Sequence, residues 1–267
     1  MANEESNSKA RLMTANCKVC SAKSAYFGEA ELLRRYRVQY FRCGKCGFIQ
    51  TEAPYWLEEA YSSAIARQDV GIMHRNLMNR EVASAVINLL FSGAERCLDF
   101  GAGHGMLVRL MRDRGFNFFW SDLHATNDYA RGFERENGAK YDFLTAFEVL
   151  EHLIDPISGL EEMMSLSENV FVSTCIVPKP APALADWWYY APTTGQHVSF
   201  YSEESLQLVA ARFGRRLLSA GPYHLFSKDP RNRFLYWLAN RPKLARIVNS
   251  IFRRTSLIES DFRQMTR

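Results

Sequence analysis

The sequence lacks a strong excess of either charge, because 33 Lys and Arg residues are balanced by 29 Asp and Glu, for a net charge of +4. A balance this even neither requires nor excludes a nucleic-acid partner. No apolar run reaches the roughly 18 residues that a membrane-spanning helix needs. The 15 glycines and 9 prolines are too few for a collagen-like or low-complexity chain of 267 residues. With 47% hydrophobic residues, the chain is expected to bury a core of its own.

The first ten residues are polar and contain acids, without the apolar stretch of a signal peptide. We therefore expect a cytoplasmic protein, in which cysteines are thiols or metal ligands and not disulfides. Cys97 and Cys175 lie in apolar runs and are expected in the core.

The other four cysteines form two Cys-x-x-Cys pairs with 22 residues between them. Four thiolates at this spacing can close a tetrahedral zinc site, and a site without an open position is structural and not catalytic. The alternatives are free thiols and thiol–disulfide chemistry. Residues 1–50 are therefore predicted to form a zinc-ribbon module with these ligands: Cys17, Cys20, Cys43 and Cys46.

Residues 51–228 alternate short apolar runs with amphipathic ones, which predicts an α/β fold with a mostly parallel sheet and helices on both faces. Ligands of such sheets bind beyond the carboxyl ends of the strands. Strands are expected at 95–100, 117–122, 141–147 and 169–176, with a hairpin at 216–221 and 223–228. Helices are expected at 55–66, 74–90, 106–115, 129–138, 155–166 and 202–214.

The segment LDFGAGHG (98–105) connects the first of these strands to a helix. Its alternating glycines allow a tight turn and close approach of a ligand, and the free N–H groups of the following helix favour an anionic group such as a carboxylate. Met106 occupies the position where a dinucleotide-binding G-x-G-x-x-G loop has glycine, and Asp99 suits a cationic ligand better than a pyrophosphate. Asp122, at the end of the next strand, can accept hydrogen bonds from ribose hydroxyls, unless it is only a helix N-cap.

The acid, the three glycines and the strand-end Asp122 resemble class I S-adenosylmethionine-dependent methyltransferases, which have a Rossmann-like fold. The segments YDFLTAFEVLEHLIDP (141–156) and APTTGQHVSFYSEESL (191–206) are also similar to this superfamily, so that the resemblance covers about residues 55–228. It implies that the glycines line the methionine part of the cofactor, Asp122 holds the ribose, Leu123 lies beside the adenine, and Phe147 and Glu148 lie near the methionyl group. The implied cofactor-binding residues are Asp99, Gly101, Gly103, Gly105, Asp122, Leu123, Phe147 and Glu148.

A zinc module on a class I methyltransferase domain resembles the sugar C-methyltransferases and related enzymes of polysaccharide and natural-product clusters. The acceptor implied is a small molecule or a carbohydrate. The sequence departs from the pattern in three ways. Only 19 residues separate Asp122 from Asp142, so the third strand is compressed or missing, and Gln196 replaces the acid that often precedes the histidine at 197. The residues after 228 are also too few for the large C-terminal domain of the full-length sugar enzymes.

Two histidines are candidates for the base that would remove a proton from the acceptor. The resemblance makes His197 the first choice, and His152 follows the fourth strand, where it could reach the substrate. The alternative is that both are hydrogen-bonded packing residues, and that Glu148 and Glu151 are a structural pair. The aromatic segment 185–194 is either a substrate wall or a packing element.

Residues 229–267 form a basic, amphipathic tail that Pro242 is expected to divide into two helices. Seven Lys or Arg residues and no acid lie between 231 and 254, interleaved with apolar side chains. The tail packs on its own core, contacts an anionic membrane surface or binds a protein; nucleic acid is the least favoured partner. The rivals to a small-molecule methyltransferase are an RNA or protein methyltransferase and a non-catalytic cofactor-binding module.

Overall fold

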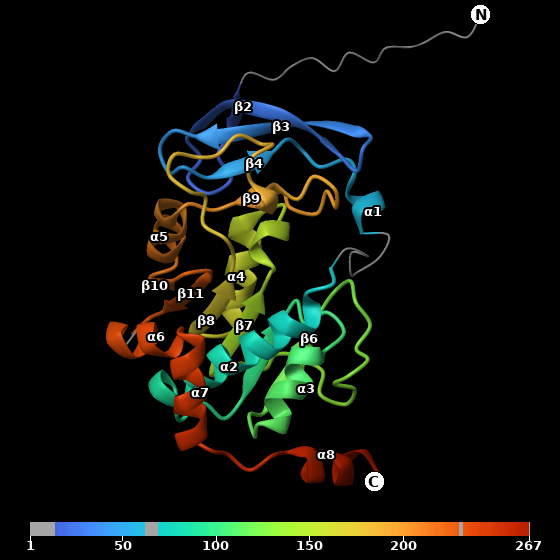
Figure 1. Ribbon diagram of the computed structural model, residues 1–267, viewed down its shortest axis with the longest axis vertical. Helices are drawn as coiled ribbons and strands as arrows, with labels where there is room; N and C mark the ends of the chain where they lie inside the picture. The colour runs from blue at the N-terminus through green and yellow to red at the C-terminus, as the bar shows by residue number, and fades with distance from the viewer. Residues whose placement is uncertain (1–13, 62–68, 230–231, 267) are drawn as a thin grey trace, which may run out of the picture.

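The computed structural model describes residues 14–61, 69–229 and 232–266, which form two β-sheets and the helices around them. Figure 1 shows the smaller sheet, built mainly from the N-terminal segment, at one end of the molecule and the larger sheet below it. No helix within the described ranges is both long and apolar enough to cross a bilayer.

The larger sheet has six strands in the order β10-β11-β8-β7-β5-β6. Strands β6, β5, β7 and β8 are parallel, and β11 is antiparallel to both of its neighbours. The predicted parallel sheet and terminal hairpin are therefore confirmed. The strands are β5 (Cys97–Phe100), β6 (Phe118–Ser121), β7 (Phe143–Phe147), β8 (Asn169–Ser173), β10 (Arg216–Ala220) and β11 (Tyr223–Ser227).

Both faces of this sheet are covered by helices, because successive side chains of the central strands point to opposite faces and are apolar on both. Phe143 belongs to a core cluster shared with α2, α3, α6 and α7, and its neighbour Leu144 belongs to one shared with α4 and α5. The helices are α2 (Ile72–Leu90), α3 (Met106–Asp113), α4 (Pro156–Leu166), α5 (Glu203–Arg212), α6 (Arg233–Ala239) and α7 (Pro242–Ile251).

The starts of two helices follow from local sequence. Asp155 accepts hydrogen bonds from the backbone N–H groups of Ile157 and Ser158, with Pro156 in the first helical position of α4. Ser202 and Ser205 form a reciprocal capping box at the start of α5. Both helices were expected at these positions, and the expectation is confirmed.

The helix expected at 129–138 is wrong. Gly132 has φ +84°, and the side chain of Asn127 accepts from the N–H of Ala130, so that the chain turns instead of continuing a helix. Residues 133–135 lie along β6, where Trp120 donates to the carbonyl of Phe133 and accepts from the N–H of Arg135. This single parallel bridge occupies the place of the compressed third strand. The helix expected at 55–66 is observed as α1 (Leu57–Ala60), and residues 62–66 lie outside the described part of the chain.

The smaller sheet is antiparallel, with the order β1-β2-β3-β4-β9. Four of its strands are N-terminal, but β9 comes from the segment after β8 and pairs with β4. Two short 3₁₀ helices pack against this sheet. The first, η1 (Leu150–His152), contacts β9, and η2 (Trp188–Tyr190) shares a core cluster with the strands of the sheet. The strands are β1 (Thr14–Asn16), β2 (Lys23–Leu32), β3 (Tyr36–Cys43), β4 (Ile49–Thr51) and β9 (Ser199–Phe200).

The C-terminal helices pack on the larger unit. Tyr236, Ala239, Ala245 and Val248 are buried in the core cluster of α2 and α3, and α7 begins at Pro242 as predicted. The last helix, α8 (Ile258–Met265), lies against α3 (Figure 1). Packing on the protein's own core therefore accounts for these buried residues of the tail, most of whose described residues are exposed.

Candidate functional site

The glycine loop lies between β5 and α3, and its three glycines have the left-handed φ values of +68°, +53° and +85°. A Cβ on Gly101 would lie 2.6 Å from Cγ2 of Val149, so this position has no room for a side chain. A Cβ on Gly103 would meet nothing within 4 Å, so the backbone there is open to a ligand. Gly105 is the N-cap residue of α3 and provides no side-chain cap for the amides of the first turn. The loop thus combines close backbone packing on one side with open space on the other.

Asp122 lies beside this loop, as predicted. One carboxylate oxygen accepts from the backbone N–H of Gly103 at 2.8 Å, and the other accepts from the N–H groups of His124 and Ala125. Trp120 Nε1 donates to the carbonyl of Gly103 at 2.8 Å. Two residues at the carboxyl end of β6 therefore hold the loop by binding both the backbone N–H and the backbone carbonyl of Gly103. No helix begins in the described residues directly after Asp122, so its role is not that of a helix N-cap.

Asp99 is buried at the end of β5 and accepts a hydrogen bond from the hydroxyl of Thr145 at 2.6 Å. Burial raises the pKa of Asp99 to about 7; the Thr145 hydrogen bond opposes this shift, and the negative charge of Asp122 adds to it. A cationic group nearby would favour the ionised form of this carboxyl.

The other predicted cofactor residues differ in their surroundings. Leu123 lies at the surface and is 87% exposed. The ring of Phe147 packs on Phe171 and Tyr223, which turns it toward the core. Glu148 has φ +54°, an unusual conformation for a residue with a side chain, and Ser173 binds both its backbone N–H and its carboxylate.

The two candidate bases lie together, although 44 residues separate them in the sequence. His152 ends η1, His197 lies just before β9, and their ring centroids are 4.9 Å apart. Glu151, also in η1, offers a carboxylate oxygen within 4.8 Å of a nitrogen of each ring. Val198 donates its backbone N–H to the carbonyl of Glu151, which joins η1 to the segment before β9.

Each ring is oriented by a backbone carbonyl. Nδ1 of His197 is 2.7 Å from the carbonyl oxygen of Tyr189, and Nδ1 of His152 is 3.1 Å from that of Gln196. Tyr61 places its hydroxyl 2.9 Å from the same nitrogen of His152. Burial lowers the pKa of both histidines, so both rings are neutral near pH 7.

The sequence names Glu151, the third residue of this cluster, only in the alternative that it forms a structural pair with Glu148. Its side chain is fully buried, and within the described ranges neither carboxyl oxygen has a hydrogen-bond partner. The hydroxyls of Thr174 and Tyr189 lie near enough to this carboxyl to oppose the rise in its pKa, but they are bonded to each other at 3.1 Å. Burial raises the pKa of Glu151 to about 8, and the charge of Glu148 contributes further. The EH dipeptide was visible in the sequence, but the unpartnered state of the carboxyl was not.

The family that matches this sequence is described as a methyltransferase domain, and the match covers residues 73–220, more than half of the chain. The chain belongs to this family. The class I methyltransferase fold predicted from the glycine loop is thereby confirmed. No curated protein matches the sequence.

Several solved methyltransferase structures are similar to this methyltransferase at low identity. An O-methyltransferase family protein from Burkholderia thailandensis is 17% identical, with a TM-score of 0.46 over 64% of this chain and 66% of its own. The mitomycin 7-O-methyltransferase is 16% identical, with a TM-score of 0.44 over 64% of this chain and 59% of its own. A magnesium protoporphyrin IX methyltransferase from Synechocystis PCC 6803, solved with bound SAM, is 16% identical, with a TM-score of 0.39 over 64% of this chain and 87% of its own. The matched part therefore spans less than two thirds of the first two proteins.

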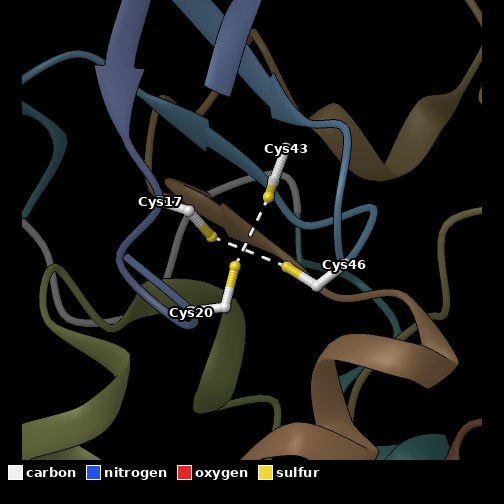
Figure 2. A group of neighbouring side chains, drawn as sticks. All are labelled: Cys17, Cys20, Cys43 and Cys46. Carbon is white, nitrogen blue, oxygen red and sulfur yellow. Dashed lines mark hydrogen bonds between the residues drawn. The ribbon is translucent and has the colours of Figure 1, made fainter. Parts of the chain in front are cut away.

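The four N-terminal cysteines of this methyltransferase come together as predicted (Figure 2). The Sγ atoms of Cys17 and Cys46 are 3.6 Å apart, and those of Cys20 and Cys43 are 3.5 Å apart. Tetrahedral zinc with Zn–S bonds of about 2.3 Å places sulfurs about 3.8 Å apart, so the donor set fits this ion with small adjustments. The arrangement gives the zinc-ribbon prediction a matching geometry.

The cysteine cluster is also attached to the methyltransferase core. Ser202, the N-cap of α5, donates its hydroxyl to the backbone carbonyl of Cys46. Gly47, with φ +71°, lies against the same serine, where a Cβ would come within 3.2 Å of it. The second Cys-x-x-Cys pair, Cys43 and Cys46, therefore contacts the segment that follows His197 and β9.

The aromatic segment 185–194 is mainly a packing element. Tyr189 and Tyr190 are buried among the side chains of the smaller sheet, and the ring of Tyr189 lies 4.8 Å from that of His197. Trp188 is 75% exposed and is the residue of this segment best placed to contact something outside the fold.

Proposed function

We propose that the protein transfers the methyl group of S-adenosylmethionine to a small-molecule or carbohydrate acceptor. The observation that carries this proposal is the placement of two groups of residues at the carboxyl ends of neighbouring parallel strands. The glycine loop and Asp122 follow β5 and β6, and the cluster of Glu148, Glu151 and His152 follows β7. A methyl donor and an acceptor bound to these two groups would meet at one edge of the sheet.

On the cofactor side, we assign the methionine part to the open backbone at Gly103, between Gly101 and Gly105. The free N–H groups at the start of α3 suit its carboxylate, and Asp99 suits its cationic groups. Asp122 would bind the ribose with oxygen lone pairs that its backbone bonds leave free. Leu123, Phe147 and Glu148 complete the proposed set, with Leu123 contributing to the adenine site from the surface.

On the acceptor side, we assign His197 and His152. Their neutral rings can accept a proton at physiological pH, which agrees with the base role that the resemblance implies for His197. The four cysteines would hold a structural zinc ion. The supporting geometry is the closed sulfur set and its attachment to α5 through Ser202.

Calorimetric titration of S-adenosylhomocysteine tests this function. We expect micromolar binding to the wild-type protein, no binding of NAD, and a loss of at least tenfold in affinity for Asp122→Ala. Asp142→Ala is a matched control, because Asp142 also accepts from two backbone N–H groups, those of Glu95 and Arg96, but at the opposite end of β5. Absence of S-adenosylhomocysteine binding by zinc-loaded protein, or equal losses in both variants, would contradict the proposal.

For location, we propose a cytoplasmic enzyme that touches an anionic membrane surface through α6 and α7. Phe234, Trp237 and Ile251 are 64%, 46% and 70% exposed, and basic side chains are interleaved with them. Sedimentation with phosphatidylserine vesicles, compared with phosphatidylcholine vesicles, tests this contact. Equal recovery with both lipids, or no effect of Ile251→Ser, would contradict it.

A further inference from the structure

The buried carboxyl of Glu151 has no hydrogen-bond partner within the described part of the chain. A buried polar group without a partner costs free energy that folded proteins normally avoid, and such a group in a native fold calls for a bound water, ion or ligand. The side chain is fully buried, so bulk water does not satisfy it. The group that completes this carboxyl must therefore supply positive charge or a proton.

The two neighbouring histidines add acceptors and no donors. A backbone carbonyl only accepts, so Nδ1 of His197, at 2.7 Å from the carbonyl of Tyr189, carries the ring proton. Nδ1 of His152 has two partners, the carbonyl of Gln196 at 3.1 Å and the hydroxyl of Tyr61 at 2.9 Å; since the hydroxyl can accept, a proton on Nδ1 is compatible with both contacts. In this tautomer the Nε2 atom of each ring carries no proton and offers a lone pair. Metal-binding histidines are oriented in this way, with one ring nitrogen donating to a carbonyl and the other binding the ion.

We propose that Glu151, His152 and His197 bind a divalent cation. One donor atom from each residue lies within 4.8 Å of the others, whereas donors on metal bonds of about 2.1 Å lie about 3 to 4 Å apart, so binding requires small side-chain movements. Two imidazoles and one carboxylate suit zinc, iron(II) or manganese(II), and three protein ligands leave positions open for another group. This site is separate from the four cysteines, whose soft, closed donor set selects zinc.

The consequence for catalysis rests on the proposed function. An acceptor hydroxyl bound at an open position would lose its proton to solvent more readily, because the ion stabilises the oxyanion. That oxygen would then form the bond to the methyl carbon while the bond from that carbon to the sulfonium sulfur breaks, releasing S-adenosylhomocysteine. The acceptor class would be a hydroxyl compound, and His197 would act as a ligand and not as a free base, since both roles use the same lone pair.

The test is a titration of Mn²⁺ into protein that already contains one zinc per chain. The electron paramagnetic resonance signal of free Mn²⁺ measures how much of the added ion is bound. Manganese prefers oxygen and nitrogen to thiolate ligands, so the cysteine site does not compete. We expect one Mn²⁺ site in the wild-type protein and at least tenfold weaker binding in Glu151→Gln and in His197→Gln. His104→Gln is the matched control, because His104 also lies beside a carboxylate, that of Asp128 at 2.6 Å, but outside the proposed site.

Zinc content, thermal melting and S-adenosylhomocysteine binding are measured on every variant. Retained folding and zinc with lost Mn²⁺ binding supports the site. Wild-type protein that binds S-adenosylhomocysteine but no Mn²⁺, or variants that keep full Mn²⁺ affinity, would overturn it and leave Glu151 as a protonated partner of a histidine. Failure of S-adenosylhomocysteine binding alone would count against the proposed function and not against the cation site.

Discussion

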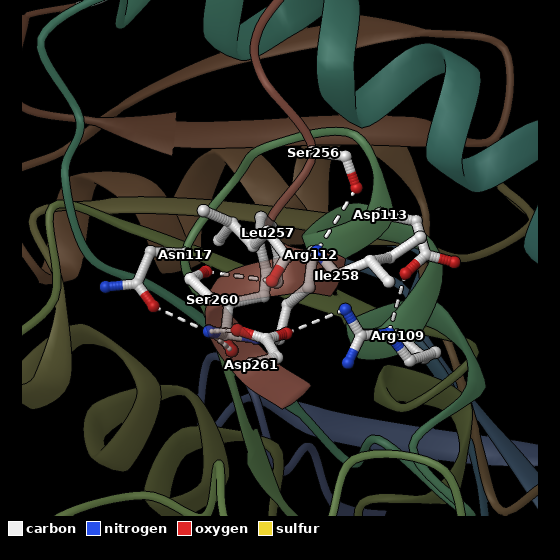
Figure 3. Close-up of polar contacts among 10 residues, drawn as sticks. Arg109, Arg112, Asp113, Asn117, Ser256, Leu257, Ile258, Ser260 and Asp261 are labelled. Atoms are coloured by element: carbon white, nitrogen blue, oxygen red, sulfur yellow. Dashed lines mark hydrogen bonds and ion pairs between the residues drawn. The ribbon is translucent and has the colours of Figure 1, made fainter. Parts of the chain in front are cut away.

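The buried ion pair between α3 and α8 allows a prediction of stability with a definite size. The side chains of Arg112 and Asp261 are only 5% and 6% exposed, and they share two hydrogen bonds of 2.6 and 2.9 Å (Figure 3). Arg109 gives the same carboxylate a third bond at 2.7 Å. The guanidinium of Arg112 also lies 3.6 Å from the ring centroid of Phe133, so it cannot turn into water without losing that contact.

Asp261→Asn keeps the size of the side chain and removes its charge, which leaves Arg112 buried beside a neutral group. Removing one partner of a buried pair costs about 3–5 kcal/mol. At roughly 2–4 °C per kcal/mol, the melting temperature should fall by about 6–20 °C. The assay is chemical and thermal unfolding followed by circular dichroism. Glu259→Gln is the control, because its pair with Arg263 is 73% and 70% exposed and should contribute less than about 1 kcal/mol.

The pH dependence gives a second reading of the same variant. Burial alone would raise the pKa of Asp261, but its hydrogen bonds to Arg112 and Arg109 outweigh burial and lower it below the ordinary value of 3.8. A lowered pKa contributes stability above the unfolded value that is lost as the pH falls through the folded value. The difference in the free energy of unfolding between wild type and Asp261→Asn should therefore be constant at neutral pH and shrink below about pH 4. Equal melting temperatures for the two variants and the wild type would refute the reasoning.

Three further outcomes are expected. Burial raises the pKa of Asp99 to about 7, so ionisation of this carboxyl opposes folding above the unfolded pKa of 3.8, and the penalty is complete above pH 7. In ligand-free unfolding at pH 8, Asp99→Asn should therefore be more stable than the wild type by up to about 4 kcal/mol. A more stable wild type at this pH would contradict the prediction. Gly101→Ala should lower stability and S-adenosylhomocysteine affinity more than Gly138→Ala. Both glycines have positive φ, but only a Cβ at position 101 would meet a neighbour, Val149 at 2.6 Å. Calorimetry of the two variants measures both effects. Cys43→Ser should reduce bound zinc below one per chain and lower the melting temperature, whereas unchanged zinc by mass spectrometry would count against the ribbon.

The parts of the fold that local chemistry determines could be predicted from the sequence. Two helices start at caps whose hydrogen bonds join residues no more than three apart, Asp155 before Pro156 and the Ser202–Ser205 box. The local sequence is therefore enough to predict these helix starts. The helix expected at 129–138 fails because its polar pattern resembles a solvent-exposed helix. The backbone groups of 133–135 are instead used by Trp120, a partner that local periodicity cannot reveal.

The candidate site shows the same division. The glycine loop and Asp122 are recognisable because their spacing is fixed by one strand-turn-helix unit. For Glu151 the sequence leaves a structural pair with Glu148 as one alternative, since a glutamate beside a histidine looks ordinary in a sequence. What distinguishes it is a fully buried carboxyl with no hydrogen-bond partner among the residues that the structure describes, and this property depends on the three-dimensional fold.

The boundary expected at residue 50 separates the cysteine module from the catalytic segment in sequence, but the chain connects them in space. Strand β9 completes the N-terminal sheet through β4, and His197 lies immediately before β9. On the other side of β9, Ser202 donates to the carbonyl of Cys46 while capping α5. The chain just after His197 is thus fixed twice, by the pairing of β9 with β4 and by the hydrogen bond from Ser202 to Cys46. A zinc ion that only stabilised the ribbon would still affect the position of this histidine, because both attachments belong to the same antiparallel sheet and its turns. Loss of zinc should therefore weaken Mn²⁺ binding at Glu151 and His197 before it weakens S-adenosylhomocysteine binding at Asp122, whose contacts lie within the larger sheet.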